Sequence, residues 1–458
     1  MKTVHPRRAR TLGRRGVALA AAGAAAAMLL AACGGGSSSS TGGGGGSGST
    51  GSVKGQTITY WASVEGTGPA QTTSTLTKEF RTFTKQTGVH VKLQVIPWSD
   101  LEQKILTSVT SGSGPDVMEI GNTWSPSLAA SGGFVSFTPS TFAKIGGESK
   151  FVKTGLEVAG APGKAPMSVP VYGEAYALVY NKADFKAAGI SQPPKTWTQL
   201  LADGKKLTTH GRHGIAIEGN SASEAAHWAF FLGEQAGNPL YSGGKWDFAT
   251  PKEATAVSTY INMVAKGGIA SPADAEYDSS QSVSDFANNK TAMLVWQNPT
   301  ETLAQLGMKP SQYGVTPIPV PNPLPAGGKA VESFPAGINL AVPSSTSHEA
   351  AALKLVKYMT SPAAQVKING TYGTFPTITS AYKAAAFQTP DAKVFEKIYS
   401  GATPLPQVPS ESTMETDLGG AINHLIGRAA STGAVSTSQI LASLKSAQDQ
   451  LNASQAAG

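Results

Sequence analysis

The sequence predicts an α/β protein of two lobes, each a mainly parallel β-sheet flanked by helices. Three observations support this prediction. About 400 residues follow the glycine- and serine-rich stretch that ends at Gln56, which is more than one hydrophobic core usually organises. Apolar residues recur at strand spacing and helix spacing in alternation. The stretch from Met167 to Trp197 then indicates where one α/β unit ends and another begins.

The first unit alternates between strands and helices. Residues 58–61 form the first predicted strand, and a helix with Leu76, Phe80 and Phe83 on one face should end at Gly88. The elements that follow are a strand at 89–95, a helix capped by Ser99 and Glu102 that ends near Ser111, and a strand at 115–120. This order predicts parallel strands with right-handed crossovers.

The stretch between the units has its own local signals. Pro170 holds residues 169–171 extended, because proline fixes its own φ and restricts the residue before it. Residues 175–180 are a predicted buried strand, and residues 183–188 a short helix that Gly189 ends. Thr196 with Gln199 then forms a capping box that begins the next helix.

The residues of this stretch also carry a family resemblance: Pro170, Glu174, Ala175, Tyr180, Asn181, Lys182 and 193–197. The run resembles the extracellular solute-binding proteins of the sugar-binding class, relatives of maltose-binding protein. The resemblance covers roughly residues 57–455 and implies a periplasmic-binding-protein-like fold of type II, whose lobes are joined by about three crossings.

The second lobe and the return of the chain follow the same pattern. The predicted elements are a strand at 214–219, helices at 221–235, 250–263 and 282–288, a strand at 291–296, a crossing at 313–325, a return segment at 336–339, a helix from 347 and a last crossing at 372–376. The expected division of the chain is a signal peptide at 1–32, an acylated cysteine and tether at 33–56, a first lobe of 57–170 and 329–373, a second lobe of 171–317 and 374–458, and a proline-rich crossing at 318–328.

The N-terminal residues indicate export and not fold. A basic segment and the apolar run 17–32 precede Leu30-Ala31-Ala32-Cys33, which matches the lipobox of bacterial lipoproteins. We therefore expect Cys33 to carry lipid and to anchor the protein to the outer face of the cytoplasmic membrane. Either the general secretory route or the twin-arginine route fits this leader.

Charge and cysteine content exclude several function classes. Without the six basic residues of the leader, 30 basic residues stand against 29 acidic ones, so nothing favours nucleic acid as a partner. Cys33 is the only cysteine, which excludes disulfides and thiol catalysis in the folded body. No nucleotide-binding, zinc-protease or serine-hydrolase motif is present, and no cofactor or metal is expected.

The candidate site follows from the strand ends. Ligands of open α/β sheets gather beyond the carboxyl ends of the strands, where this chain offers polar groups beside aromatic rings. These residues are Ser63, Glu65, Asn122, Thr123, Trp124, Tyr172 and Glu174. Rings that stack on a sugar and polar groups that pair with its hydroxyls suit a carbohydrate.

Further candidate residues lie in the rest of the chain. They are Glu224, His227, Trp296, Asn298, Phe334, Tyr372 and Met414. Trp296 is the preferred stacking platform, with core packing as the alternative, and Trp98 and Trp197 are interpreted as structural. Met414 and Glu415 stand where maltose-binding relatives have an aromatic platform, which weakens the expectation of a sugar relative to another polar solute.

Together these observations predict a binding protein and not an enzyme. The resemblance implies a monomer whose lobes close over a carbohydrate, an oligosaccharide or sugar derivative, and deliver it to the permease of an ABC transporter. The alternatives are a binding protein for a non-sugar solute and a secreted hydrolase acting on glycosides, for which Glu65, Glu174 or Glu224 offer paired carboxylates.

Overall fold

The structure is a computed structural model that describes residues 52–209 and 211–457. The expected signal peptide, Cys33 and most of the tether lie outside the described residues. The folded body begins earlier than the expected residue 57, because Val53 is buried in the first-lobe core and the Gly55 amide donates to the Gly88 carbonyl at 2.8 Å. The predicted end of the tether at Gln56 is therefore wrong.

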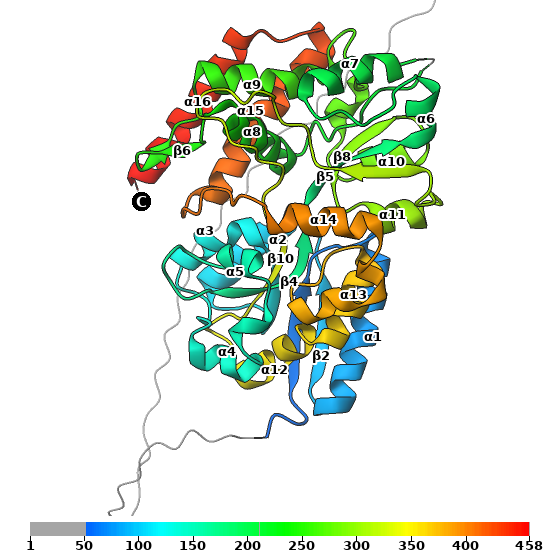
Figure 1. The fold of residues 1–458 in the computed structure, drawn as a ribbon. Coiled ribbons are helices and arrows are strands. Elements are labelled where there is room, and N and C mark those ends of the chain that lie inside the picture. Colours follow the sequence, from blue (N-terminus) through cyan, green and yellow to red (C-terminus); the bar gives the residue numbers. More distant parts are fainter. Residues whose placement is uncertain (1–51, 210, 458) are drawn as a thin grey trace, which may run out of the picture. The chain divides into compact units, whose positions relative to one another are not determined.

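The first lobe is built on a five-stranded sheet with the order β2-β1-β3-β10-β4 (Figure 1, lower half). The strands are β1 (Thr57–Ala62), β2 (His90–Val95), β3 (Val117–Gly121), β4 (Ser168–Glu174) and β10 (Ala336–Ala341). β1 pairs in parallel with β2 and β3, whereas β10 is antiparallel to both β3 and β4. The helices of this lobe are α1 (Pro69–Thr87), α2 (Trp98–Ser111), α3 (Ser125–Ala130), α4 (Pro139–Ile145), α5 (Lys153–Glu157), α12 (Glu349–Met359) and α13 (Pro362–Tyr372).

The second lobe has a smaller sheet with the order β8-β5-β9 (Figure 1, upper half). Its strands are β5 (Tyr176–Asn181), β8 (Met293–Gln297) and β9 (Tyr313–Thr316), and a separate ribbon joins β6 (Tyr241–Ser242) to β7 (Lys245–Trp246). The helices are α6 (Lys182–Ala187), α7 (Trp197–Leu207), α8 (Ala222–Ala236), α9 (Pro251–Ile261), α10 (Gln281–Ala287), α11 (Thr300–Gln305), α14 (Pro390–Ser400), α15 (Glu411–Thr432) and α16 (Thr437–Ala457).

The strand directions correct one expectation. β5 is antiparallel to both β8 and β9, so the mainly parallel sheet predicted for the second lobe is wrong. The predicted strand at 214–219 makes only one isolated parallel bridge, from Ala216 to Leu294, and a second bridge joins the preceding His213 to Thr291. Apolar periodicity tells which residues are buried but not the direction in which a strand runs, because both directions alternate side chains in the same way.

Local sequence signals set several helix ends. The capping box at α7 is confirmed, since Thr196 Oγ1 accepts from the Gln199 amide and Gln199 Oε1 accepts from the Thr196 amide. Gly88 ends α1 in the left-handed conformation, with φ 73°. The cap predicted at Ser99 is wrong, because α2 already begins at Trp98 behind an extended Pro97 and no side chain caps it.

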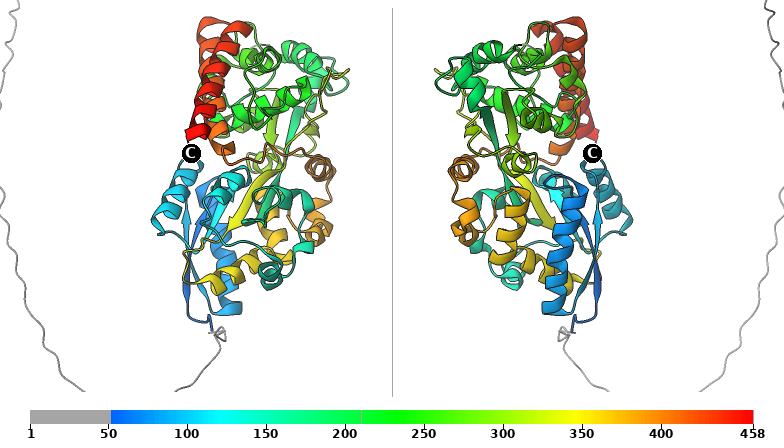
Figure 2. Two further views of the ribbon diagram at one scale, coloured as in Figure 1. Left: turned by 90° about the vertical axis from the view of Figure 1, so that its left-hand side faces the viewer. Right: turned by 90° about the vertical axis from the view of Figure 1, so that its right-hand side faces the viewer.

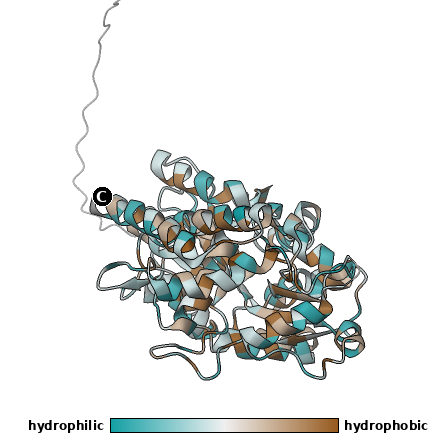
Figure 3. Cartoon of the chain, turned by 90° about the horizontal axis from the view of Figure 1, so that it is seen from above, coloured by the Kyte–Doolittle hydropathy of each residue, from teal (hydrophilic) through white to brown (hydrophobic). Residues whose placement is uncertain are grey.

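Each lobe has its own hydrophobic core. Apolar residues of β1, α1 and α12 form the first core, and residues of β5, α8, α9 and α15 form the second. Figure 3, which looks down on the second lobe, shows hydrophilic and hydrophobic residues interleaved along the helices that cover it. No helix among residues 52–209 and 211–457 has both the length and the apolar character needed to cross a membrane.

The chain passes between the lobes at three places, and Figure 2 shows the division from two sides. β4 continues into β5 through Ala175, and residues 317–335 lead from β9 back to β10. The third passage follows α13, where Phe375 and Gly173 exchange backbone hydrogen bonds of 2.7 and 2.9 Å. The residues that join the sheets therefore lie beside the strand end that carries Glu174.

Candidate functional site

Glu119 organises the polar end of the first-lobe sheet. It lies on β3 and is fully buried, and its Oε1 accepts from the hydroxyls of Tyr60 at 2.6 Å and Tyr172 at 2.8 Å. Its Oε2 accepts from the backbone amide and the hydroxyl of Ser63, both at 2.7 Å. Burial raises the pKa of Glu119, and these donated hydrogen bonds oppose the rise. Two predicted site residues, Ser63 and Tyr172, are thus fixed by a carboxylate that the sequence did not single out.

A second hydrogen-bond network lies in the second lobe, on the side that faces the first lobe. The Tyr176 hydroxyl lies 2.7 Å from Glu224 Oε1 and 2.7 Å from His227 Nδ1, and His227 Nε2 lies 2.8 Å from Glu415 Oε1. α8 supplies Glu224 and His227, while α15 packs on α8 and supplies Glu415. The Gln297 amide also donates to the Tyr176 hydroxyl. The network therefore joins β5, β8, α8 and α15.

The hydrogen-bond geometry fixes how many protons this network holds. Three contacts link Glu224, Tyr176, His227 and Glu415, and each contact needs one proton. Tyrosine supplies one and a neutral imidazole supplies one. The network must therefore hold a third proton, on the imidazole or on one of the carboxyl groups. Burial raises the pKa of Glu224, and the nearby His227 and the Tyr176 hydrogen bond counteract this rise.

The two lobes meet directly beside these networks. The Thr123 hydroxyl, at the end of β3, donates to Glu415 Oε2 at 3.3 Å. Ser127 of α3 and Ser412 of α15 lie with their hydroxyl oxygens 3.2 Å apart. The Asn122 side-chain amide donates to the Pro335 carbonyl, on the segment that returns to the first lobe. Loops of the first lobe and the first turns of α15 are therefore in contact in this structure.

Two glutamates lie between the networks. Glu65 is 8 % exposed, and the Ser63 hydroxyl lies 2.7 Å from its Oε1. Burial, followed by the charges of Glu174 and Glu119, raises the pKa of Glu65 well above its usual value. Burial and the charge of Glu224 raise the pKa of Glu174 to about 7. Charge repulsion thus links the first-lobe carboxylates to those of the second lobe.

The predicted aromatic residues separate into two groups. Trp124 stacks on Trp98 with ring centroids 4.5 Å apart, and Trp98 is 40 % exposed, so part of this pair is open to solvent. Tyr172 meets Tyr372 edge to face at 5.5 Å. Phe334 is 2 % exposed and packs on His227 and Phe231 in the second core. Met414 is also fully buried in that core.

Trp296 and Asn298 occupy positions on either side of Gln297. Because side chains alternate across a strand, Trp296 lies on the face of β8 that packs with Val179 and Leu294, opposite the face of Gln297. Gln297, and not Trp296, joins the Tyr176 network. Asn298 has φ 40° and accepts from the Ala175 amide at 3.0 Å, so it holds the β4–β5 passage.

Sequence reasoning missed Glu119, Tyr176 and Gln297, and it treated Trp98 as structural. Tyr176 and Gln297 occupy the same face of paired strands, opposite each other in register, and only the structure gives that register. Glu119 had a weak signal, a lone carboxylate inside an otherwise apolar strand.

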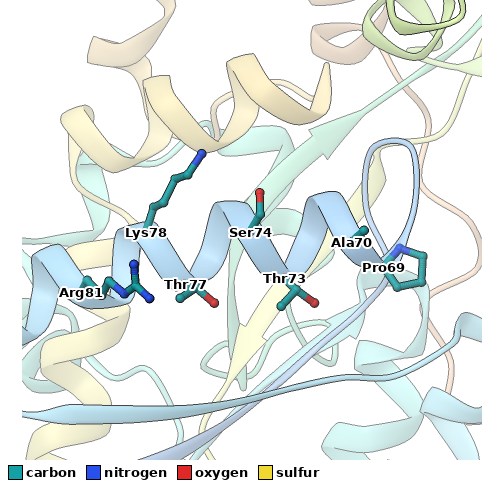
Figure 4. A pocket seen from close by; sticks show the side chains of 7 residues that line it. All are labelled: Pro69, Ala70, Thr73, Ser74, Thr77, Lys78 and Arg81. Atoms are coloured by element: carbon teal, nitrogen blue, oxygen red, sulfur yellow. The ribbon is translucent and has the colours of Figure 1, made fainter.

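Other surface features lie away from these networks. One hollow runs along the outer face of α1, as Figure 4 shows, and is lined by Pro69, Ala70, Thr73, Ser74, Thr77, Lys78 and Arg81. Another lies on α2 around Gln103 and Leu106. Within the described part of the chain, no three His, Cys, Asp or Glu side chains are placed to hold a metal ion.

Known proteins resemble this chain in sequence and in fold. Residues 69–366 match the family model of the bacterial extracellular solute-binding proteins. A putative binding protein of Brucella abortus is 24% identical over 234 residues, which are 51% of this chain and 56% of the relative, so the chain matches little more than half of that protein. The diacetylchitobiose binding protein DasA of Streptomyces coelicolor is 28% identical over 314 residues, 66% of this chain and 69% of DasA.

The fold has been solved in relatives of low identity. A solute-binding protein of an ABC transporter from Thermotoga lettingae, bound with α-D-tagatose, superposes with a TM-score of 0.75 at 22% identity, over 87% of this chain and 99% of the other. The expected two-lobe, periplasmic-binding-protein-like fold is thereby confirmed. Since the family model also spans more than half of the sequence, this chain belongs to the bacterial extracellular solute-binding protein family.

Proposed function

We propose that the protein captures a carbohydrate between its lobes, leaves it chemically unchanged and delivers it to the permease of an ABC transporter. Membership of the solute-binding family supports the binding role. Two relatives, one named for diacetylchitobiose and one bound with a sugar, support the solute class.

One observation carries the proposal: polar side chains of both lobes converge at their junction. Tyr176, Glu224, His227 and Gln297 lie on the second lobe, and Thr123 reaches Glu415 from the first. Hydroxyls, an amide and carboxylates offer both donors and acceptors, which sugar hydroxyls require on every face. A buried donor or acceptor that finds no partner on the solute costs about 1–3 kcal/mol of binding free energy. Such a network therefore discriminates between solutes.

Capture requires the lobes to separate first. The contacts of Thr123 with Glu415 and of Ser127 with Ser412 are individually weak and solvent can replace them. The passages at Ala175 and Phe375 are short and would act as hinges. We propose that opening exposes the two networks and that the solute stabilises the closed form.

The N-terminal leader indicates the cellular location of the protein. We propose that Cys33 is lipidated after export and holds a monomeric protein on the outer face of the cytoplasmic membrane, near the permease.

A ligand screen tests the proposal. Purified full-length protein is heated with neutral monosaccharides, oligosaccharides, polyols and amino acids, and hits are titrated by calorimetry and analysed by chromatography. We expect at least one sugar to bind at one per chain and to be recovered intact. Stabilisation by amino acids alone would favour the non-sugar solute, and shortened oligosaccharide would favour the hydrolase.

A further inference from the structure

Exposed basic side chains gather at the end of the first lobe where the described chain begins. The backbone brings three segments together at this end. The Gly55 amide donates to the Gly88 carbonyl, and the His90 amide donates to the Gln56 carbonyl, both at 2.8 Å. Figure 1 shows this end at the foot of the first lobe, away from the second lobe. Four exposed cations lie on these segments and are hereafter the basic pole: Lys54, Arg81, Lys85 and Lys92.

The members of the basic pole come from three elements. Lys54 precedes β1 and covers the end of α1, since a Cβ atom on Gly88 would lie 2.5 Å from Lys54 Cγ. Arg81 and Lys85 lie in the last two turns of α1, and Lys92 lies on the edge strand β2. A helix C-terminus favours a cation, which accounts for Lys85 alone. Arg81 stands four residues before Lys85, a spacing at which like charges destabilise a helix, so the stability of α1 does not explain the set.

No acidic side chain of the same segments balances the basic pole. Between Ser52 and Ser99 the chain has two acids, Glu65 and Glu79, and both are buried. The ion pairs formed among the described residues include no member of the basic pole. The residues before Ser52 contain neither aspartate nor glutamate, so they offer no side-chain carboxylate either.

Acids of the neighbouring segments are already engaged. Asp116 accepts from the Thr59 amide of β1 at 2.7 Å, and its other oxygen lies 3.0 Å from His348 Nδ1. Glu349 pairs with Lys144 at 3.3 Å. The chain without its leader has nearly equal numbers of acidic and basic residues, so the basic pole is a local excess of positive charge. A local excess of this kind indicates an anionic partner.

The first described residues tie the basic pole to the proposed anchor. Val53 is buried in the first-lobe core, and Cys33 stands twenty residues earlier in the chain. Even when fully extended, this length of chain spans about 70 Å. β1 begins beside the basic pole at Thr57 and ends next to Ser63, whose amide and hydroxyl donate to Glu119. A strand of six residues is about 20 Å long, so the basic pole and the polar network of Glu119 lie at opposite ends of β1.

We propose, on the basis of the anchoring at Cys33 proposed above, that the basic pole binds the anionic phospholipid headgroups of the same membrane. Guanidinium and ammonium groups donate charge-assisted hydrogen bonds to phosphate oxygens. The attraction between exposed charges fades beyond about 10 Å in dilute salt, and the anchor keeps the lobe near the surface. The first lobe then stands on the membrane, and the junction of the lobes is held away from it, where solute arrives from outside.

Lysine labelling on vesicles tests the proposal. Purified full-length protein is coupled through Cys33, its only thiol, to a maleimide lipid in vesicles of phosphatidylcholine, either alone or with about one-third phosphatidylglycerol. A brief pulse of an amine-acylating reagent is followed by mass spectrometry of each lysine. We expect Lys54, Lys85 and Lys92 to react at least threefold more slowly on the anionic vesicles, whereas the exposed Lys205 of α7 should react equally on both. Salt at about 0.5 M should abolish the difference.

Removal of charge locates the contact. Arg81→Gln combined with Lys92→Gln should bring the labelling rate of Lys54 on anionic vesicles to within twofold of its rate on neutral vesicles. The control combines Lys186→Gln with Lys245→Gln, which removes the same charge from exposed positions of the second lobe and should leave the threefold difference intact.

Three results would overturn the proposal. Equal labelling rates on the two kinds of vesicle show that anionic lipid does not attract the basic pole. Slowing of Lys205 by the same factor shows that the protein has no preferred face, and equal protection on neutral vesicles shows that charge is not the cause. Thiol coupling replaces any natural lipid, so these results do not depend on lipidation of Cys33, which is decided separately by fractionation of the Cys33→Ser protein.

Discussion

The hydroxyl oxygen of Ser63 lies 2.7 Å from Oε1 of Glu65 and 2.7 Å from Oε2 of Glu119. One hydroxyl has one proton, so one of the two contacts must be donated by a carboxyl group. Glu119 already accepts from Tyr60, Tyr172 and the Ser63 amide, which favours its ionised form. Glu65 is therefore the protonated partner, in agreement with the raised pKa of Glu65.

This assignment predicts unequal effects of two isosteric substitutions. In Glu65→Gln the side-chain amide replaces the carboxyl O–H as donor to Ser63, so the free energy of unfolding should stay within about 0.5 kcal/mol of wild type. In Glu119→Gln a side-chain N–H₂ group replaces a carboxylate oxygen that accepts two hydrogen bonds. Loss of this acceptor should lower the free energy of unfolding by about 1–3 kcal/mol. Urea denaturation measures the free energy of unfolding of both variants. A larger loss in Glu65→Gln than in Glu119→Gln would show that the proton is on the other residue.

The raised carboxyl pKa values predict that stability falls as pH rises. The pKa values of Glu174 and Glu102 are raised by burial from the ordinary 4.5 to about 7. Between these values the folded protein binds more protons than the unfolded chain, so the free energy of unfolding decreases from about pH 4.5 through pH 7. We expect the unliganded protein to melt at a higher temperature at pH 5.5 than at pH 8.

A single substitution checks that these carboxyl groups cause the effect. Glu174→Gln should reduce the difference in melting temperature between the two pH values, because a glutamine does not titrate. Glu349→Gln, on an exposed carboxylate, is the control and should leave the difference unchanged. A melting temperature that rises from pH 5.5 to pH 8 in wild type would contradict the account.

Two adjacent glycines of α15 offer a matched test of how Glu415 is positioned. A Cβ atom on Gly419 would lie 1.9 Å from the Ala222 carbonyl oxygen of α8, whereas one on Gly420 would meet nothing within 4 Å. Gly419→Ala should therefore destabilise the protein by about 1–3 kcal/mol and weaken solute binding, because α15 is pushed from His227. Gly420→Ala should stabilise it by about 0.5–1 kcal/mol. Equal effects in thermal melts would refute the close helix packing.

Cys33 allows a test of localisation. Cys33→Ser should move the protein from the membrane fraction of the expressing bacterium to the soluble exported fraction, because one side chain carries the proposed anchor. Ser37→Ala, in the adjacent tether, is the control. Membrane retention of the Cys33→Ser protein would exclude lipid as the anchor.

The sequence predicted the order of elements well because local signals were strong. Alternating apolar residues mark β2, Gly88 ends α1, and Thr196 with Gln199 caps α7. Polar residues directly after strands, such as Ser63 and Asn122, were also correctly placed at the sheet edge, since parallel strands end there.

Long-range packing explains what could not be predicted. Glu415 meets His227 and Thr123 only because α15 returns across α8, and no local pattern encodes that distance. A single step along β8 decides that Gln297 and not Trp296 faces the network, since adjacent side chains point to opposite faces. The antiparallel strands of the second lobe likewise depend on where the chain returns.

The central claim is that the solute enters between lobes that part at α3 and α15. Ser127→Cys with Ser412→Cys, made in a Cys33→Ser background, places two thiols where the hydroxyl oxygens lie 3.2 Å apart. With the disulfide formed, the account predicts that a sugar identified by the screen no longer enters, and that a reductant restores wild-type binding in calorimetry. Each single-cysteine variant should bind normally throughout. Undiminished and equally rapid binding by the oxidised double variant would contradict the account.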